Sequence, residues 1–371
     1  MTVVSAMDIF CVDHGASLRW TETAPVCCLT TTILRVVDGD GAEGIAGYDS
    51  YMPAPSDRSV LEALRSTAPA LLGRDTGARA ALAHDLRVAV VFPQATVPLA
   101  IMDTALWDLE ARRADEPLSH LLGPARRESI PAYASLTTMT TEEDYLATVA
   151  QACEDGLGAV KVHAWGEPER DIRLLERLRA AHPDLVLMHD AEGVYDRDGA
   201  LRVGRALEAI GARWFEAPLP DFDLEGYRHL RHQLDVPILP AGYAMWDTLQ
   251  FVEALRDPPW SAVRAELTCT LGVTALCEIA RLAHSLGLDF EPVSYGHTLS
   301  QAANLHVMLA FDNVRYFELP YPVEPWEYGV VAPIRPEPDG TVALPSGPGL
   351  GVELDWEWVE RSAFARISLG P

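Results

Sequence analysis

The stretch Gly158-Ala-Val-Lys-Val-His-Ala-Trp165 decides how the rest of this chain is interpreted. It contains Lys161, the one lysine among 29 lysines and arginines. A buried amine can lose its proton near neutral pH, whereas a guanidinium keeps its charge, so the two side chains differ in the chemistry they allow. The lysine is therefore a candidate functional group, unless it is only a solvated residue left over in an arginine-rich composition.

The chain around this stretch repeats a strand followed by a helix. After residues 126–128, eight short apolar segments alternate with amphipathic helical patterns. Their C-terminal ends recur every 23 to 29 residues, the length that one strand, one helix and two short loops occupy, and eight such units close a parallel barrel. The expected strands are 130–136, 159–163, 185–190, 214–217, 237–241, 262–267, 289–293 and 316–319.

Polar side chains gather where these strands end. The ends are marked by Ser135, Lys161, Asp190, Glu216, Tyr243, Glu266, Val293 and Glu318. A buried parallel strand is apolar throughout, so charged residues concentrated at one end indicate a site rather than core. Because the active site of a parallel barrel lies at the C-terminal ends of its strands, Lys161 is expected at the mouth of the barrel.

The segment before the barrel predicts a small α+β domain. Residues 27–37 are rich in β-branched residues, the turn 38–41 reads Asp-Gly-Asp-Gly, and residues 42–48 can return as a second strand. This pattern predicts a β-hairpin. Apolar residues at helical spacing follow over 57–87 and again over 97–122, which predicts helices after the hairpin.

Two loops of this domain are candidates for binding substrate. The loop 17–26 carries Arg19 and Trp20, and the loop 50–56 carries Tyr51. Aromatic and cationic side chains among turn-forming residues suit a mobile lid, but ordinary surface loops have similar sequences. The sequence leaves both interpretations open.

Composition and charge exclude several classes of partner. The 371 residues are 49% hydrophobic, which suits a well-buried globular core, and the formal net charge is −25. So acidic a chain repels nucleic acid and anionic membrane, and no segment offers the roughly eighteen apolar residues of a membrane span. We expect a cytoplasmic protein, and its six cysteines, which show no CxxC pairing, are expected as free thiols.

Several motifs follow one another along almost the whole chain: Leu99-Ala-Ile-Met-Asp-Thr-Ala-Leu-Trp-Asp-Leu109, Pro117-Leu-Ser-His-Leu-Leu-Gly123, Gly158-Ala-Val-Lys-Val-His163, Trp214-Phe-Glu-Ala-Pro218, Ala302-Ala-Asn-Leu-His306, Asp339-Gly340 and Leu344-Pro-Ser-Gly-Pro-Gly-Leu-Gly351. Together they resemble the enolase superfamily, and within it the mandelate racemase-like group. The resemblance implies an α/β fold, a modified TIM barrel of the (β/α)7β type, and suggests a symmetric homo-oligomer. It places an N-terminal α+β capping domain at 1–126, the barrel at 127–335, and a C-terminal segment returning to the cap at 336–371.

In this family, acidic residues on the third, fourth and fifth barrel strands hold Mg2+, which stabilises the enediolate formed when a base removes the α-proton of a carboxylate substrate. The resemblance assigns two of these positions to Asp190 and Glu216. The third carries Tyr243, and a phenol with a pKa of about 10 is a poor Mg2+ ligand. Glu192, two residues after Asp190, is an alternative ligand or a solvated loop residue. The sequence leaves open whether Mg2+ binds.

On the second barrel strand the family often has Lys-x-Lys, with the second lysine as base. Here the pair is Lys161 and His163, and residues i and i+2 of a strand share a face, so both side chains can enter the barrel mouth. The resemblance puts His163 in the position of the base, with an ordinary pKa of about 6.5, and leaves Lys161 to hold the carboxylate or stabilise the enolate. The alternative for His163 is a packed histidine bonded to a carbonyl.

The opposite face of the barrel departs further from the family. Where the family's His-Asp dyad would lie, the sixth strand has Glu266 and the seventh has Val293. His297, four residues further on, is expected either to swing toward Glu266 and rebuild an acid–base pair or to be an ordinary loop histidine. Glu318 matches the acid on the eighth strand, which bonds the substrate carboxylate or enolate when protonated; a solvated glutamate is the alternative.

These departures favour one reaction class. A racemase with a base on each face of the α-carbon needs the missing dyad, whereas elimination of water needs one base and one acid, which can share a face. The expected function is therefore a lyase of the acid-sugar or hydroxy-acid dehydratase type, acting on a small carboxylate through an enolate, with His163 as base and His297 or Tyr243 as acid. The alternatives are an epimerase or cycloisomerase using the same enolate, and a binding protein on a degenerate enzyme scaffold.

Overall fold

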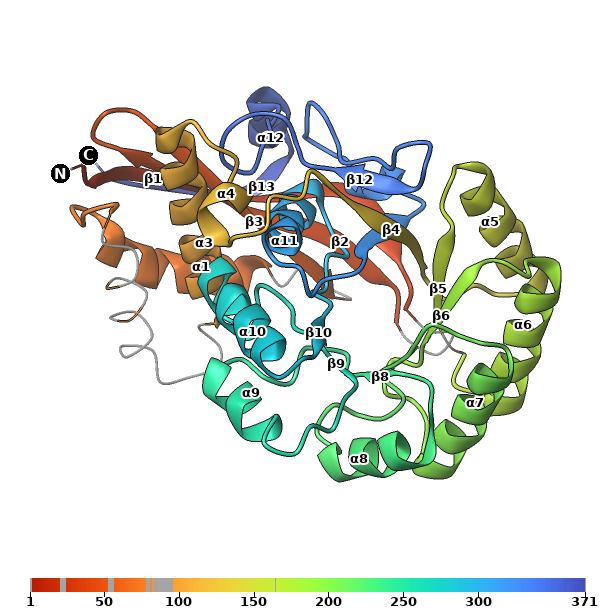
Figure 1. The fold of residues 1–371 in the computed structure, drawn as a ribbon. Coiled ribbons are helices and arrows are strands. Elements are labelled where there is room, and N and C mark those ends of the chain that lie inside the picture. Colours follow the sequence, from red (N-terminus) through yellow and green to blue (C-terminus); the bar gives the residue numbers. More distant parts are fainter. Residues whose placement is uncertain are drawn as a thin grey trace.

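The computed structural model describes the chain except residues 1, 21–24, 53–56, 78–80, 82–83, 85–95, 164 and 371, and of residues 51 and 52 it describes only the backbone. Figure 1 shows two parts: a cap that contains both ends of the sequence, and a ring in which strands and helices alternate. The predicted fold class, an α+β cap on a modified (β/α)7β barrel, is confirmed.

The cap is built on a four-stranded antiparallel sheet in the order β13-β1-β2-β3. The predicted hairpin is confirmed, since β2 and β3 pair in antiparallel register along their length. Strand β1 is not among the elements predicted from the sequence, although Met7, Asp8 and Ile9 alternate between buried and partly exposed positions. The bounds are β1 (Val4–Leu18), β2 (Cys27–Asp38), β3 (Glu43–Met52) and β13 (Ala363–Leu369).

Helices of the cap pack on this sheet and enclose a separate apolar core. Their bounds are α1 (Asp57–Thr67), η1 (Ala68–Leu71) and α3 (Thr96–Ala114). The short helix α4 (Ser119–Leu122) instead contributes Leu122 to the larger core shared with the barrel. Helix α3 lies so close to β3 that a Cβ at Gly44 would be 2.1 Å from the carbonyl oxygen of Ala105. A side chain at position 44 would therefore displace the helix from the cap sheet.

All eight predicted barrel strands are present at their expected places. Six of them form a parallel sheet in the order β11-β4-β5-β6-β7-β8, and β9 and β10 form a parallel pair. The strands are β4 (Ser129–Leu136), β5 (Ala159–His163), β6 (Val186–Asp190), β7 (Phe215–Glu216), β8 (Ile238–Leu239), β9 (Ala262–Val263), β10 (Asp289–Phe290) and β11 (Phe317–Tyr321). The helices that follow them form the outer ring (Figure 1): α5 (Glu142–Glu154), α6 (Pro168–Ala181), α7 (Arg197–Ala209), α8 (Leu224–Gln233), α9 (Thr248–Ala254), α10 (Val273–Ser285) and α11 (Thr298–Ala310).

The interior of the barrel is filled below its mouth by one apolar layer. The layer consists of Tyr133, Ala159, Met188, Trp214, Leu239 and Ala262, with Tyr316 packed against it. Because residues i and i+2 of a strand share a face, the next inward-pointing residues lie one layer higher. That higher layer is polar and contains Ser135, Lys161, Asp190, Glu216, Arg264 and Glu318.

The segment after the barrel contacts both parts of the molecule. Strand β12 (Thr341–Ala343) pairs with the start of β4, and after α12 (Trp356–Ser362) the chain joins the cap sheet as β13. A short helix, η3 (Glu324–Trp326), follows β11. The tail thus returns to the cap as the resemblance implies, while the boundaries expected at 126/127 and 335/336 remain predictions.

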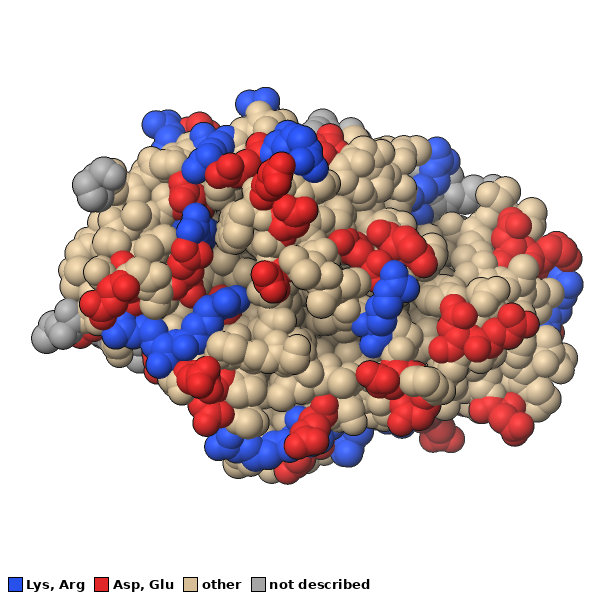
Figure 2. Space-filling model, turned by 90° about the horizontal axis from the view of Figure 1, so that it is seen from above, with Lys and Arg blue, Asp and Glu red and all other residues tan. Residues whose placement is uncertain are grey.

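The exposed surface carries charges of both signs. On the face seen in Figure 2, acidic and basic side chains are interspersed. Within the described part of the chain, no helix combines the length and the apolar character that crossing a membrane requires. The expectation that neither nucleic acid nor membrane is a partner remains a prediction from the net charge.

Candidate active site

A cavity of about 280 Å³ lies where the C-terminal ends of the barrel strands meet the cap. This volume suits a small molecule rather than a polymer. The cap supplies Trp20, Tyr48 and Asp49, the barrel strands and the residues just beyond them supply Lys161, His163, Asp190, Glu216, Arg264 and Glu318, and the barrel loops supply Glu192, Ala241, Tyr243 and Tyr295.

Lys161 is buried at this cavity and contacts three carboxylates. Its Nζ lies 3.1 Å from Asp190 Oδ2, 2.9 Å from Glu216 Oε1 and 2.6 Å from Glu318 Oε1. Burial alone lowers the pKa of a lysine, but the charges of Glu216 and Glu318 outweigh burial and hold the pKa of Lys161 well above its usual value. In this arrangement Lys161 is a fixed positive charge and not a base.

Arg264 is a second buried cation at the cavity, and it is absent from the site residues predicted above. Its Nε lies 2.9 Å from Glu216 Oε1, and its Nη2 donates to Glu318 Oε2 at 2.6 Å. Arg264 follows Ala262 of β9 by two residues and therefore points into the barrel. The two-residue period of a strand could therefore have identified Arg264 as a residue of the site.

The two carboxylates between these cations differ in proton affinity. Burial raises the pKa of Glu318, but the charges of Arg264 and Lys161 outweigh it and bring the pKa down to about 2. Burial raises the pKa of Glu216 to about 8 in spite of the nearby Arg264. Glu318 is therefore ionised at neutral pH, unlike the protonated acid that the resemblance implies, whereas Glu216 can hold a proton.

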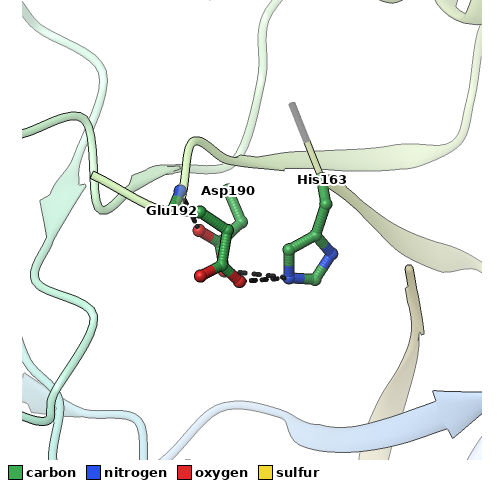
Figure 3. A group of neighbouring side chains, drawn as sticks. All are labelled: His163, Asp190 and Glu192. Carbon is green, nitrogen blue, oxygen red and sulfur yellow. Dashed lines mark hydrogen bonds and ion pairs between the residues drawn. The ribbon is translucent and has the colours of Figure 1, made fainter. Parts of the chain in front are cut away.

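His163, Asp190 and Glu192 point toward one another where β5 and β6 end (Figure 3). His163 Nε2 lies 3.3 Å from Asp190 Oδ2 and 3.0 Å from Glu192 Oε1, and its Nδ1 is bonded to the carbonyl oxygen of Leu136. Because a carbonyl only accepts, Nδ1 carries a hydrogen and Nε2 is the basic nitrogen of the neutral ring. Burial lowers the pKa of His163, but Asp190 and Glu192 outweigh it and raise the pKa to about 10. At neutral pH the ring is an imidazolium.

Glu192 reaches this group from a turn, because β6 ends at Asp190. Its backbone has a φ of 52°, which is uncommon for a residue other than glycine, and its N–H donates to Asp190 Oδ1 at 2.9 Å. Such strained residues often occur at functional sites. Ligand atoms of His163, Asp190 and Glu192 lie within 4.8 Å of one another, so a proton on the ring or a cation can be shared among them.

The three positions that the resemblance assigns to Mg2+ do not fit that ion. Glu216 Oε1 already lies 2.9 Å from both Lys161 Nζ and Arg264 Nε, so an ion bonded to this oxygen would lie beside two cations. The third position is Tyr243, which lines the cavity with a 53% exposed side chain and offers a neutral phenol. Mg2+ requires near-octahedral oxygen ligation, and this set does not supply it.

The expected acid–base pair of His297 and Glu266 is not formed. His297 Nδ1 accepts from the N–H of Leu299 at the start of α11, and its Nε2 donates to the carbonyl of Tyr328 at 2.7 Å. Glu266 accepts from Thr268 Oγ1 at 2.6 Å. Neither residue belongs to the described residues that line the cavity. The side chain of His297 caps α11, and the carboxylate of Glu266 is hydrogen-bonded within its own loop.

Three cap residues were expected at the cavity, and of the two whose side chains are described, Trp20 reaches it. The Trp20 ring lies 5.9 Å from the His163 ring and 5.1 Å from the Tyr295 ring, between centroids. Arg19 is exposed and does not belong to the described lining, and the side chain of Tyr51 lies outside the described residues. The cap residues Tyr48 and Asp49, which β3 brings to the cavity, were not predicted.

Two family models match the chain. The mandelate racemase / muconate lactonizing enzyme N-terminal domain matches residues 7–123, and the enolase C-terminal domain-like model matches residues 144–358. The chain belongs to the mandelate racemase/muconate lactonizing enzyme family. The resemblance found in the sequence motifs is thereby confirmed.

Relatives of this mandelate racemase-like protein include two named enzymes. L-talarate/galactarate dehydratase from Salmonella typhimurium is 29% identical over 311 residues, which cover 81% of this chain and 73% of that protein. D-galactarolactone cycloisomerase from Agrobacterium fabrum is 28% identical over 365 residues, which cover 92% of each protein. The prediction of an enzyme of the dehydratase or isomerase type within this group agrees with both.

Solved structures similar to this mandelate racemase-like protein cover its full length. A Pseudovibrio sp. protein assigned to the mandelate racemase/muconate lactonizing enzymes superposes with a TM-score of 0.96, at 31% identity and with complete coverage of both chains. L-talarate dehydratase from Polaromonas sp. JS666, in complex with Mg and L-glucarate, superposes with a TM-score of 0.88 over both complete chains. The second structure is 23% identical, so its likeness concerns the fold.

Proposed function

We propose that this enzyme removes water from a hydroxy acid of the acid-sugar type through an enolate. Named relatives that act in this way include talarate/galactarate, arabinonate and gluconate dehydratases. The observation that carries the proposal is the position of Lys161 and His163, two residues apart on β5 and both at the cavity. A fixed positive charge and a group that exchanges protons are thereby placed next to one bound molecule.

The reaction is a β-elimination. Removal of the α-proton leaves its electron pair in the enolate, the enolate expels the β-hydroxyl as water when an acid protonates it, and the resulting enol becomes a 2-keto-3-deoxy acid. Lys161 and Arg264 supply positive charge to the enolate. His163 Nε2 takes the α-proton in its deprotonated form, and the phenol of Tyr243, which lines the cavity, protonates the departing hydroxyl.

A panel of aldonic and aldaric acids tests this function. Formation of an α-keto acid reports dehydration, and proton NMR in deuterated water reports exchange at the α-carbon. We expect Lys161→Met and His163→Asn each to lower turnover by about 100-fold or more, while His229→Asn, at an exposed histidine of α8, leaves it unchanged. Wild-type turnover in both cavity variants would contradict the proposal.

Cycloisomerisation of a sugar-acid lactone is the second candidate. It is favoured by the cycloisomerase relative, because that match covers 92% of each protein whereas the talarate/galactarate dehydratase match covers 73% of the relative. The reaction uses the same enolate but releases no water. Conversion of a lactone to a product of unchanged mass would identify it, because dehydration lowers the mass of the substrate by that of one water.

Three further properties remain proposals. We infer a small carboxylate as substrate, a homo-oligomeric state and a cytoplasmic location from the sequence. Light scattering of the purified protein measures the oligomeric state, and a mass equal to the 40.6 kDa of one chain would contradict the second of these.

A further inference from the structure

The replaced ligand of the family's metal site and a buried arginine lie at one place in the barrel. Beyond the end of β8 the third acidic ligand is replaced by Tyr243, and just beyond the end of β9 Arg264 points into the same cavity. A Cβ at Gly242 would lie 3.2 Å from Arg264 Cγ, so the arginine side chain packs against the segment that carries the missing ligand. The position of the missing carboxylate and the buried arginine are therefore neighbours.

Tyr243 and Arg264 together give the site the formal charge that the family's ion and third carboxylate give it. In the family, a divalent ion and a third carboxylate together add one net positive charge to the positions of Asp190 and Glu216. Here a guanidinium and a neutral phenol add the same single positive charge. Tyr243 without Arg264 would leave the site one positive charge short of this balance.

Arg264 also makes contacts that suit a fixed charge centre. Its Nε lies 2.9 Å from Glu216 Oε1, its Nη2 lies 2.6 Å from Glu318 Oε2, and its Nη1 donates to the carbonyl of Glu291 at 3.3 Å. The side chain is 2% exposed. Two hydrogen-bonded nitrogens and the ion pair at Nε hold the planar group in place, as a charge that stabilises an enolate must be held.

We propose that Arg264 replaces the metal ion of this family, so that this enzyme needs no divalent ion at the positions of Asp190, Glu216 and Tyr243. The guanidinium lines the cavity together with Lys161, and the two cations together bind the carboxylate of the substrate. The role of Arg264 toward the enolate rests on the proposed dehydration, whereas the absence of metal binding does not.

The neighbouring group of His163, Asp190 and Glu192 is the rival place for an ion. One imidazole nitrogen and two carboxylates suit a transition metal better than Mg2+. In the structure the ring nitrogen His163 Nε2 contacts both carboxylates directly, at 3.3 and 3.0 Å. A protonated ring therefore satisfies this group without an ion, and the experiment separates the two sites.

Calorimetric titration with MgCl2 and MnCl2 tests the proposal on chelator-treated protein. The wild type is expected to show no saturable binding. The double variant Tyr243→Glu/Arg264→Gln, which restores a third carboxylate and removes the blocking cation, is expected to bind one ion per chain. The matched single variant Tyr243→Glu keeps Arg264 and is expected to bind at least about tenfold more weakly than the double variant. These readouts involve no turnover, so they are independent of the proposed reaction.

Three results would overturn the proposal. Saturable binding by the wild type that is lost in Glu216→Gln would show that the family site is intact. Saturable Mn2+ binding that is lost in Glu192→Gln but kept in Glu216→Gln would place an ion at His163 instead. A folded double variant that binds no ion would show that Tyr243 and Arg264 are not the pair that excludes it. If circular dichroism shows the double variant unfolded, the wild-type titration decides: no saturable binding supports the proposal and saturable binding overturns it.

Discussion

Lys161 Nζ and Glu318 Oε1 lie 2.6 Å apart, the shortest of the three contacts that this lysine makes with carboxylates. The residues come from β5 and β11, which lie on either side of β4 in the barrel sheet. Their ion pair therefore crosses a strand, and Ser135 of that intervening strand donates to the same carboxylate oxygen at 2.9 Å. Three adjacent strands are thus tied together directly at the cavity.

Removing the amine is expected to destabilise the protein. Lys161→Met leaves buried carboxylates without one of their two permanent cations, and breaking a buried ion pair in this way costs about 3–5 kcal/mol. Urea unfolding measures the loss. Arg65→Met, at an exposed ion pair with Glu62, is the matched control and should change the free energy of unfolding by about 1 kcal/mol or less. A loss as small as that in Lys161→Met would contradict the prediction.

The contribution of His163 to stability is expected to decline with rising pH. Its pKa is about 10 in the folded protein against an ordinary 6.5, so folding favours the protonated ring. The stabilisation is complete below pH 6.5, decreases between 6.5 and about 10, and is absent above that. We therefore expect the difference in unfolding free energy between wild type and His163→Asn to shrink over this range. A difference that is constant or grows with pH would refute the assignment, and His229→Asn should show no trend.

The rate of α-proton exchange is expected to depend on Glu192 through its effect on His163. Proton abstraction needs the neutral ring, so the wild-type rate should rise with pH toward about 10. Glu192→Gln removes a charge that raises this pKa, and the variant should reach its plateau at lower pH. Initial rates in deuterated water from pH 6 to about 10 measure the shift, with the exposed Glu225→Gln as control. Superimposable profiles of wild type and Glu192→Gln would exclude this coupling.

Tyr243→Phe is expected to separate the two halves of the reaction. The variant keeps His163 and should still exchange the α-hydrogen at a rate close to that of the wild type. Without the phenol that protonates the departing hydroxyl, keto-acid formation should fall by about 100-fold or more. Both rates can be followed in one NMR experiment. Equal losses in exchange and in elimination would show that Tyr243 positions the substrate and is not the acid.

The barrel and five of the thirteen described residues that line its cavity could be predicted because both follow from one period. Parallel strands place their C-terminal ends on one rim, so residues at the ends of successive strands meet there. Lys161, Asp190, Glu216 and Glu318 were predicted in this way, and the structure brings their side chains into direct contact. Arg264 was not predicted, because the sequence places the end of this strand at Glu266. In the structure β9 has only two residues and ends before Arg264.

Other parts of the site depend on local backbone and side-chain geometry that cannot be predicted from one sequence. His297 lies four residues beyond a strand end, but the capping of α11 and a bond to Tyr328 decide where its ring points. Glu192 reaches His163 through a left-handed backbone conformation at a residue that rarely adopts it. Trp20 reaches the cavity from the cap, so the repeat of strands in the barrel gives no information about its position.

The pairing of β13 with β1 joins segments that lie far apart in sequence, as in the bond from Ser368 Oγ to Asp8 Oδ1 across 360 positions. The whole barrel is thus a loop inserted into the cap sheet. Closing so long a loop costs conformational entropy that a compact, already folded barrel has largely removed. Pairing of β13 with β1 should therefore follow closure of the barrel, whereas β1, β2 and β3 are close in sequence and can pair before it.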